Sequence, residues 1–378
     1  MKIVIAIDSL KGSLTSMEAG RAIREGILNV LADTEVIVKP LADGGEGTTQ
    51  ALVEGLGGEM VQVDVHGPLE TSVSAEYGLL AESGTAIMEM AAAAGIILVG
   101  KDKRPLDATT YGVGEMIKDA VGRGCRNFII GIGGSATNDG GIGMLTALGY
   151  EFLDSAGRPV GISASALKEV CSVRTDHVLP ELAECRFQIA CDVTNPLCGP
   201  QGATYIYGPQ KGVTEAMKAQ LDEDMASFAQ VTARCTGTDH KESKGAGAAG
   251  GLGFAFLSYL HGDLQPGIEL VLKAVDMEGA MKGADLVFTG EGRLDYQTAM
   301  GKAPVGIAAL AKKHGAKVVA LAGAVIEGAE KCNENGIDAF FPILRRVVTL
   351  DEAMEPAQAK ENMTRTTEQI MRLIAAVR

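Results

Sequence analysis

The sequence predicts an α/β protein in which a flavodoxin-like parallel sheet domain is interrupted by an inserted mixed α/β domain. Short apolar runs followed by helical patterns occur at both ends of the chain, whereas the middle shows short alternating strands between turns. The chain has 378 residues, more than a typical single domain, and 46% of them are hydrophobic, which is ample material for packed cores.

The first elements form a βαβα unit. Residues 3–7 are continuously apolar, as in a buried parallel strand, and a polar loop follows them. Thr15 and Glu18 have the spacing of a capping box, after which apolar residues recur at helical spacing. A second strand over residues 36–41 leads into a glycine-rich loop and another helix.

The same style of sequence returns at the C-terminal end. A strand is expected over residues 285–289, followed by a loop over 290–295 and a helix over 302–314. Two more short apolar strands are expected over 317–322 and 339–343, before a final helix. The five strands, two from one end of the chain and three from the other, would fit one flavodoxin-like parallel sheet.

The middle of the chain predicts a different arrangement. Short strands alternate with turns between residues 61 and 90, and a helix is expected over 110–121. A buried strand is expected over 127–132, with further strand candidates at 187–190 and 204–207.

These patterns define the expected domain boundaries. Residues 1–61 and 285–378 would form the discontinuous flavodoxin-like domain, and residues 62–284 the inserted one. Because loops converge where parallel strands end, we expect the substrate site in a cleft between the two domains.

Composition excludes several classes of partner. The net charge of −14 disfavours a nucleic-acid partner. No stretch approaches the roughly 18–20 apolar residues of a membrane span, and the N-terminal apolar run is too short for a signal peptide. The seven cysteines include no C-x-x-C pair and predict reduced thiols. We expect a cytoplasmic protein that binds neither nucleic acid nor membrane; the sequence leaves its oligomeric state open.

Polar and charged residues gather in glycine-rich loops, most of which follow predicted strands. The first two loops contribute Asp8, Lys11, Ser13, Asp43, Gly44, Gly45 and Glu46. The third and fourth contribute Gly133, Gly134, Ser135, Thr137, Asn138, Asp139, Gly245, Gly247, Gly250 and Gly251. The last strand ends add Asp192, Asn195, Glu291, Arg293, Asp295, Gln297, Thr298 and Lys302.

Taken singly, these loops have more than one interpretation. The first is either a site for a catalytic or metal-binding carboxylate or an ordinary turn with a helix cap. The third matches G-x-G-x-x-A with Glu151 about 20 residues on, so a nicotinamide-dependent oxidoreductase acting on a small hydroxy acid is the alternative. A polar turn, and not a helix, follows that match. The fourth, preceded by polar residues, is either a closely packed Gly/Ala segment or a nest of backbone amides.

Taken together, the loops have the composition that phosphoryl transfer requires. Carboxylates and an Asn suit Mg²⁺, backbone amides and cations suit phosphates, and one Asp can act on the acceptor hydroxyl. No G-x-x-x-x-G-K-[ST] motif, H-R-D motif or clustered His is present, which disfavours the common nucleotide-binding loop and a His-driven mechanism.

The ordered motifs resemble those of a known family. They are DSLKGS, PLADGGEGT, GIGGSATNDGG, DVTNPLCG, YGPQKG, GAGAAGGLG and TGEGRLDYQTAMGKAP. In this order, over nearly the whole chain, they resemble the bacterial type 1 glycerate kinases, with Leu10 where a Phe is common. The resemblance implies ATP- and Mg²⁺-dependent phosphorylation of D-glycerate, giving 2-phosphoglycerate, in a flavodoxin-like domain with an inserted second domain.

Roles for individual residues follow from their chemistry, as hypotheses. Asp295 would accept the hydroxyl proton, and Arg293 or Lys11 would pair with the glycerate carboxylate or the transferring phosphoryl group. Asp192, with Asp8 and Asn195, would hold Mg²⁺. The glycine loops over 133–139 and 245–253 would bind phosphates through backbone amides.

Overall fold

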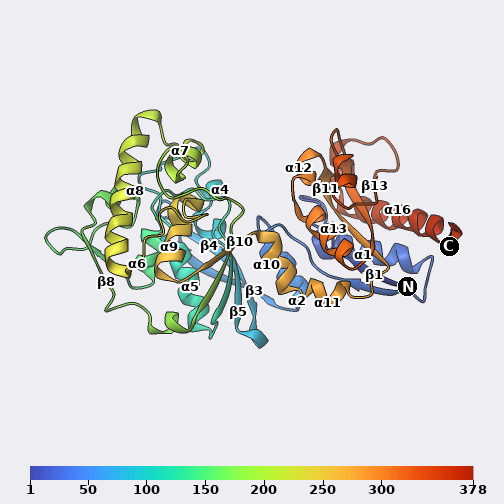
Figure 1. The fold of residues 1–378 in the computed structure, drawn as a ribbon, viewed down its shortest axis with the longest axis horizontal. Helices are drawn as coiled ribbons and strands as arrows, with labels where there is room; N and C mark the ends of the chain where they lie inside the picture. Colours follow the sequence, from blue (N-terminus) through green and yellow to red (C-terminus); the bar gives the residue numbers. More distant parts are fainter. Residues whose placement is uncertain (378) are drawn as a thin grey trace. The chain divides into compact units, whose positions relative to one another are not determined.

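The computed structural model describes residues 1–377 and divides into two compact units. The first unit comprises Met1–Asp43, Gln50–Gly57 and the segment from Val271 onward; the second comprises Gly44–Thr49 and Gly58–Leu270. The sequence had placed the boundaries at 61/62 and 284/285. In the structure, residues 271–284 belong by their contacts to the first unit. Figure 1 shows the helices and strands of both units.

The first unit is built on a five-stranded sheet. Every pair of neighbouring strands is parallel, and their order is β13-β12-β11-β1-β2. This is the flavodoxin-like order 2-1-3-4-5 counted along the sheet strands, whose direction of winding reverses between β1 and β11. The strands are β1 (Lys2–Ile5), β2 (Glu35–Val38), β11 (Leu286–Leu294), β12 (Lys317–Val325) and β13 (Ala339–Pro342).

Helices pack on this sheet from the segments between its strands. The predicted capping box is present, because Thr15 Oγ1 accepts from the Glu18 amide while the Glu18 carboxylate accepts from the Thr15 amide. The helix that it starts, α1, packs with α16 over Ile3, Ile5 and other apolar side chains on one face of the sheet. The helices of this unit are α1 (Ser16–Leu28), α11 (Met277–Met281), α12 (Tyr296–Ala299), α13 (Ala303–Lys313), α14 (Lys331–Glu334), α15 (Leu350–Met354) and α16 (Pro356–Val377). Two more, α2 (Thr48–Leu56) and α10 (Gly267–Ala274), have residues in both units.

The second unit contains a six-stranded mixed sheet and a small hairpin. The order of the larger sheet is β10-β9-β6-β5-β4-β3, in which β3, β4 and β5 are antiparallel neighbours and the rest are parallel. The strands are β3 (Glu59–His66), β4 (Ser72–Leu80), β5 (Thr85–Glu89), β6 (Asn127–Gly131), β9 (Arg186–Ala190) and β10 (Asp263–Gln265), with β7 (Glu151–Leu153) and β8 (Ser172–Arg174) in the hairpin.

Helices and short turns surround this mixed sheet, and a large apolar core packs between them and it. The α-helices are α3 (Ala91–Ala94), α4 (Ile96–Val99), α5 (Tyr111–Gly122), α6 (Ile142–Ala147), α7 (Ala203–Tyr207), α8 (Glu215–Thr236) and α9 (Leu252–Tyr259). Single 3₁₀ turns lie at Ala81–Ser83, Ala164–Glu169, Pro180–Glu184, Pro209–Lys211 and Ala248–Gly251.

Two local predictions were wrong. The strand expected at 204–207 is the helix α7, because a run of four residues carries no period that separates a strand from a helical turn. The loop expected over 290–295 is mostly strand, since β11 continues to Leu294 and stays paired with β12 through Val325. The frequent glycines of that segment had concealed its alternation.

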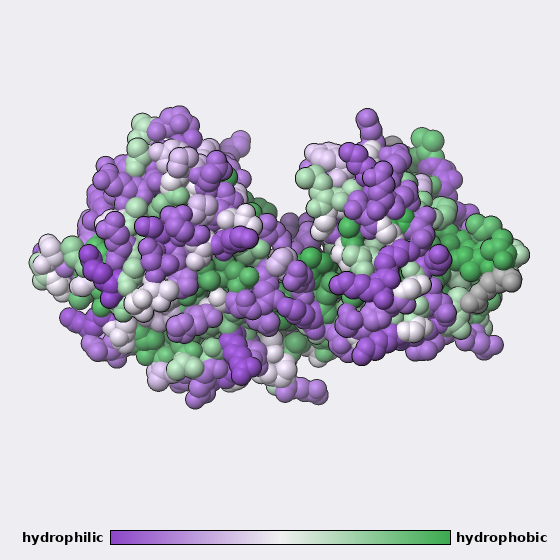
Figure 2. All heavy atoms as spheres, in the orientation of Figure 1, coloured by the Kyte–Doolittle hydropathy of each residue, from purple (hydrophilic) through white to green (hydrophobic). Residues whose placement is uncertain are grey.

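The face of the molecule seen in Figure 2 is largely hydrophilic. Figure 2 shows polar residues over the visible face of each unit, with apolar side chains gathered near the end of α16, where Leu373 and Val377 are exposed. No helix within residues 1–377 combines the length and the apolar character needed to cross a membrane.

Candidate active site

A cavity of about 380 Å³ lies at the carboxyl ends of β1, β11 and β12 in the first unit. It includes the point where the winding of the sheet reverses, which is where open α/β sheets bind ligands. Its charged and polar lining comprises Asp8, Ser9, Lys11, Ser13, Asp43, Glu291, Arg293 and Lys302. Its apolar lining includes Leu10, Ile343, Leu344, Leu350, Ala353 and Met354.

The extension of β11 explains why two of these side chains meet. Successive side chains of a strand point to opposite faces, so Glu291 and Arg293, two residues apart, share one face. Gly290, just before them, comes so close to β12 that a Cβ atom there would lie 1.8 Å from the Leu321 carbonyl oxygen. Glycine at this position lets the strand continue and deliver both charged groups to the cavity.

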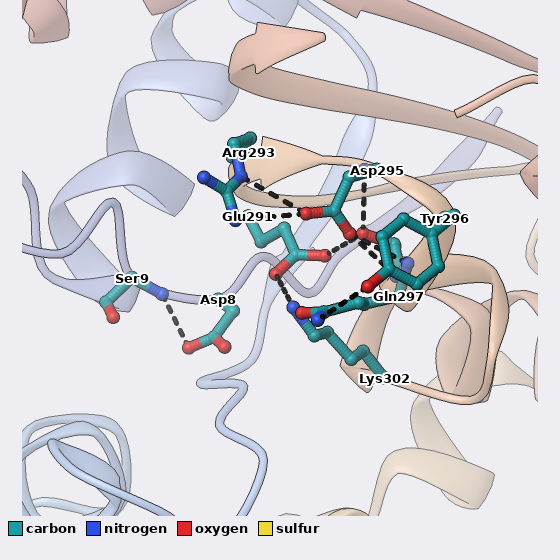
Figure 3. Close-up of polar contacts among 9 residues, drawn as sticks. Asp8, Ser9, Glu291, Arg293, Asp295, Tyr296, Gln297 and Lys302 are labelled. Atoms are coloured by element: carbon teal, nitrogen blue, oxygen red, sulfur yellow. Dashed lines mark hydrogen bonds and ion pairs between the residues drawn. The ribbon is translucent and has the colours of Figure 1, made fainter. Parts of the chain in front are cut away.

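Asp8 is a buried carboxylate in an unfavourable electrostatic environment. Only 9% of the residue is exposed, and the Ser9 amide donates to Oδ1 at 2.7 Å (Figure 3). Burial, together with repulsion from Asp43 and Glu291, raises its pKa from 3.8 to about 7, although the Ser9 amide and Lys11 oppose the increase. Asp8 can therefore exchange a proton near neutral pH.

Glu291 is held in place from two sides. Thr298 Oγ1 donates to it at 2.6 Å, and the Lys302 Nζ lies 3.8 Å from its Oε2 (Figure 3). Burial raises its pKa, while the bond from Thr298 and the charge of Lys302 act in the opposite direction. The cavity therefore combines a cluster of carboxylates with cations from three segments of the chain.

Asp295 is the N-cap of a short helix beside the cavity. Its Oδ1 accepts from the amides of Gln297 and Thr298 as the N-cap of α12, and Arg293 Nη2 lies 3.1 Å from its Oδ2 (Figure 3). Burial raises its pKa, but these amides together with Lys302 and Arg293 outweigh that effect and lower it overall. Asp295 caps the helix, contacts Arg293 and does not line the cavity; its role as acceptor of the substrate proton stays a prediction.

The remaining predicted residues of this region fall into two groups. Ser13 lines the cavity, and its buried Oγ has no hydrogen-bond partner within residues 1–377. Gln297 and Thr298 do not line it; Gln297 Nε2 donates to the Tyr296 hydroxyl at 3.3 Å, and Thr298 joins Asp295 to Glu291.

In the second unit, a smaller cavity of about 210 Å³ lies beside the loop after β6. Gly133 and Gly134 line it and are exposed, together with Gly44, Gly45 and Glu46. The amide hydrogens of residues 133–135 donate to no acceptor within the described residues 1–377. Consecutive amides of this kind form the concave donor arrangement that binds anions.

Glu89 holds in place the glycine loop over residues 44–47 that lines one side of this cavity. Its carboxylate accepts from the Gly47 amide at 3.3 Å and from the Thr49 amide at 2.9 Å, and so holds the glycine loop at the start of α2. Burial raises the pKa of Glu89, while the two amides oppose that change. The sequence analysis missed this residue, although an acidic side chain at the end of an apolar strand was a usable signal.

The rest of the third loop is buried. Thr137, Asn138 and Asp139 are fully buried, and Asp139 accepts from the amide and hydroxyl of Thr110 at 2.8 Å each and from the Gly141 amide at 3.2 Å. Asp139 therefore fixes the shape of the turn through hydrogen bonds in the interior. Asn138 donates to Thr204 Oγ1 at 3.0 Å, in the helix that replaced the predicted strand.

The fourth glycine loop packs against this turn. Gly245, Gly247, Gly250 and Gly251 are all buried, and a Cβ on Gly250 would lie 2.1 Å from the Thr137 carbonyl oxygen. Close packing, the first of its two interpretations, accounts for these glycines.

Of the residues expected to bind metal, Asp8 belongs to the first unit, and Asp192 and Asn195 belong to the second. Asp192 is exposed and accepts from the Gly267 amide at 2.9 Å. Asn195 uses both ends of its amide, donating to the Gln201 carbonyl at 2.8 Å and accepting from the Tyr207 hydroxyl at 2.6 Å. Within residues 1–377 no set of three or more His, Cys, Asp or Glu side chains is arranged to hold a metal ion.

Comparison with known proteins connects these features to one reaction. A sequence model of the glycerate kinase family matches residues 3–375. The chain is 45% identical to the glycerate kinase of Bacillus subtilis, over 98% of this chain and 97% of that protein. It is 42% identical to the glycerate 2-kinase of Escherichia coli, over 99% and 98% of the two chains.

The chain belongs to the glycerate kinase family. It is accordingly a kinase that phosphorylates glycerate. A crystal structure of a protein assigned as glycerate kinase 2 from Salmonella typhimurium LT2 superposes with a TM-score of 0.91 and 41% identity, covering 100% of this chain and 98% of that one. The two-unit α/β architecture is thus that of a glycerate kinase.

Family membership and the structure together remove the oxidoreductase alternative. A dinucleotide fingerprint requires a helix to begin at its last small residue, so that the pyrophosphate meets the helix N-terminus. In this glycerate kinase fold, Ala136 is followed by a buried polar turn, and α6 begins only at Ile142.

One further residue of the glycerate kinase fold was missed by sequence reasoning. Lys211 is 2% exposed, and its Nζ lies 2.6 Å from Ser135 Oγ and 2.6 Å from the Thr137 carbonyl oxygen. It belongs to the YGPQKG motif, which supported the family resemblance without suggesting a contact. Nothing local in the sequence distinguishes a buried lysine from an exposed one.

Proposed function

We propose that this chain transfers the γ-phosphoryl group of ATP to the C2 hydroxyl of D-glycerate, giving 2-phosphoglycerate and ADP. The observation that carries the proposal is the cavity at the switch point of the parallel sheet. It combines cations that suit an anionic substrate with a buried carboxylate, Asp8, whose pKa is raised to about 7.

Glycerate would bind through its carboxylate to Lys11 and Arg293. Both line the cavity, and Asp295 already holds the Arg293 guanidinium through Nε at 3.2 Å and Nη2 at 3.1 Å. A guanidinium held in this way loses little freedom when it binds a carboxylate, so the contact favours a defined orientation. A cavity of about 380 Å³ exceeds the size of glycerate and leaves room for the transferred group.

Asp8 would accept the proton of the attacking hydroxyl. As the hydroxyl oxygen forms its bond to the γ-phosphorus, the bond from that phosphorus to the ADP oxygen breaks, and the proton passes to the Asp8 carboxylate. A base with a pKa near 7 is deprotonated often enough at neutral pH and still has a substantial affinity for the proton. Asp8 thereby takes the role first given to Asp295.

The residues of the cavity fit a magnesium ion that accompanies ATP. Mg²⁺ in kinases is held by one or two carboxylates together with phosphate oxygens and water. Asp43 and Glu291 line the cavity, interact electrostatically with each other and would hold the ion. When bound, Mg²⁺ supplies positive charge that neutralises the phosphates.

The loop after β6 would bind nucleotide phosphates. The amides of residues 133–135 have no internal acceptor within residues 1–377, and exposed Gly133 and Gly134 leave the backbone accessible. In this proposal the first part of the loop binds the phosphates, as expected from the sequence. The buried part, from Thr137 to Asp139, holds the loop in shape.

A direct assay tests the proposal. Purified protein is incubated with Mg²⁺, ATP and D-glycerate; ADP release is followed by a coupled assay, and the product is identified by ³¹P and ¹H NMR. We expect 2-phosphoglycerate, with little turnover of L-glycerate, glycolate or lactate. Formation of 3-phosphoglycerate would contradict the proposed hydroxyl, and turnover that survives removal of all divalent cations would contradict the role of Mg²⁺.

A further inference from the structure

Lys211 places a buried amino group directly beneath the loop that follows β6. The side chain comes from the short 3₁₀ turn Pro209–Lys211, and only 2% of the residue is exposed. Its Nζ is 2.6 Å from both Ser135 Oγ and the Thr137 carbonyl oxygen. Burying a lysine is costly, so its position under this particular loop requires an explanation.

The directions of these hydrogen bonds determine what Ser135 can do. In its ammonium form Lys211 only donates, so Ser135 Oγ then accepts from it. The hydroxyl hydrogen of Ser135 then remains available, and it donates to no acceptor within residues 1–377. It lies in the same loop as the uncommitted amides of residues 133–135. One loop thus carries a hydroxyl and three amides with hydrogens available to donate, and groups of this kind bind phosphate oxygens.

The charge of Lys211 is not cancelled by a contacting carboxylate. The charge of Asp139 acts on Lys211 from a distance, while the Asp139 oxygens accept from Thr110 and from the amides of Gly141 and Gly143. No ion pair joins the two side chains within the described chain. Because the two side chains are not in contact, Asp139 offsets the charge of the ammonium only in part, and positive potential remains beneath the loop.

We propose that Lys211 is a positioning residue for the nucleotide phosphates: it orients the Ser135 hydroxyl as a donor, supports the turn through Thr137, and supplies positive charge beneath the phosphate-binding amides. This inference rests on the proposed function, because it assumes that the loop binds ATP and ADP. To the proposed function it adds that Lys211 provides charge to the phosphate site and orients Ser135 without contacting the nucleotide.

The burial of Lys211 links phosphate binding to proton uptake. Burial lowers its pKa from 10.5 to about 7, and Asp139 opposes the decrease. An anionic phosphate above the loop would favour the ammonium form and raise that pKa. Binding of ADP near pH 7.5 should therefore take up a proton at Lys211, and nucleotide affinity should fall as pH rises above about 7, because the free protein must then bind that proton.

The test measures MgADP binding by isothermal titration calorimetry at several pH values and in buffers of different ionisation enthalpy. Lys211→Met keeps the length of the side chain and removes its charge. Lys168→Met is the matched control, since Lys168 is an exposed lysine of the same unit. At pH 6.5 we expect Lys211→Met to weaken MgADP binding by about tenfold or more, and Lys168→Met to leave it unchanged.

The pH dependence separates positioning from a structural role. The protonation of free ADP changes with pH in the same way in both experiments. The ratio of the dissociation constants of Lys211→Met and wild type therefore reports on Lys211. That ratio should approach one above pH 8.5, and the proton uptake of the wild type should be absent in Lys211→Met. A constant ratio across the pH range, or equal proton uptake by the two proteins, would overturn the inference.

The Ser135→Ala variant and the double variant test the inference independently of Lys211→Met alone. Ser135→Ala should weaken MgADP binding by itself, and in the double variant the total effect should be smaller than the sum of the two, because both substitutions remove the same oriented donor. If Lys211→Met does not fold, the pH dependence of wild-type binding and the Ser135→Ala variant still decide the matter. Failure of the wild type to bind MgADP would refute the proposed function, whereas normal binding by both variants would refute only the role of Lys211.

Discussion

Replacing Asp8 by Asn should stabilise the protein while it removes catalysis. The substitution keeps the size of the side chain and an oxygen that can accept from the Ser9 amide, now 2.7 Å from Oδ1. It removes a carboxylate that the cavity makes unfavourable through burial and through repulsion from Asp43 and Glu291. Under the proposed mechanism, wild-type Asp8 is therefore a group that activity requires and folding disfavours.

The magnitude follows from the two pKa values. In the unfolded chain Asp8 titrates near 3.8, and in the folded protein near 7. At about 1.4 kcal/mol for each unit of pKa, the difference corresponds to roughly 4 kcal/mol. Below pH 4 both states are protonated and the penalty vanishes. It grows between pH 4 and 7, as the unfolded chain ionises and the folded protein does not, and it stays constant above pH 7.

The assay is urea unfolding of wild type and Asp8→Asn at pH 4 and pH 8, without Mg²⁺ or nucleotide. We expect similar stabilities at pH 4, and at pH 8 a variant more stable by up to about 4 kcal/mol in the transition of the parallel-sheet unit. Its turnover should fall by about 10² to 10⁴-fold, and wild-type kcat/KM should rise with pH to a plateau above about 7. A variant that is no more stable at pH 8, or that keeps near wild-type turnover, would refute this account of Asp8.

Three other substitutions have distinct expected outcomes. Asp295→Ala should lower the free energy of unfolding by about 1–2 kcal/mol through loss of the α12 cap, while measurable turnover persists; complete loss of turnover in a folded variant would restore Asp295 as a candidate base. Lys11→Met should raise the KM for glycerate about tenfold or more and leave the KM for ATP unchanged in steady-state assays. Gly250→Ala should destabilise by about 2–4 kcal/mol in thermal unfolding, because φ is +67° and its Cβ would lie 2.1 Å from the Thr137 carbonyl oxygen; a wild-type melting temperature would contradict the packing role.

The features that were read correctly from the sequence depend on neighbours along the chain. The capping box of α1 involves residues three apart, and the apolar run from Ile3 fits a strand buried on both faces. Short apolar strands at both ends of the chain were enough to predict one parallel sheet, because such strands need partners of the same kind. The motif order was enough to indicate the glycerate kinase family, which the comparisons confirm.

The features that were misread depend on contacts between distant residues. Glu291 and Arg293 belong to a strand because β12 continues alongside them as far as Val325, and no local pattern in a glycine-rich segment reveals that partner. Asp8 and Asp295 are both acidic residues after strands, so the sequence offers no reason to separate them. Their surroundings do: carboxylates around Asp8 raise its pKa, whereas amides and an arginine around Asp295 lower it.

The sequence by itself thus determined the start of α1 at its capping box, the parallel sheet and the family. Local spacing, apolar pattern and motif order encode these features. The folded chain decided which carboxylate has a raised pKa, which glycines are packed and which are open, and that Lys211 contacts a serine 76 residues away along the chain. Burial and electrostatic environment are sums over residues brought together by folding, and for that reason they cannot be read from any one segment.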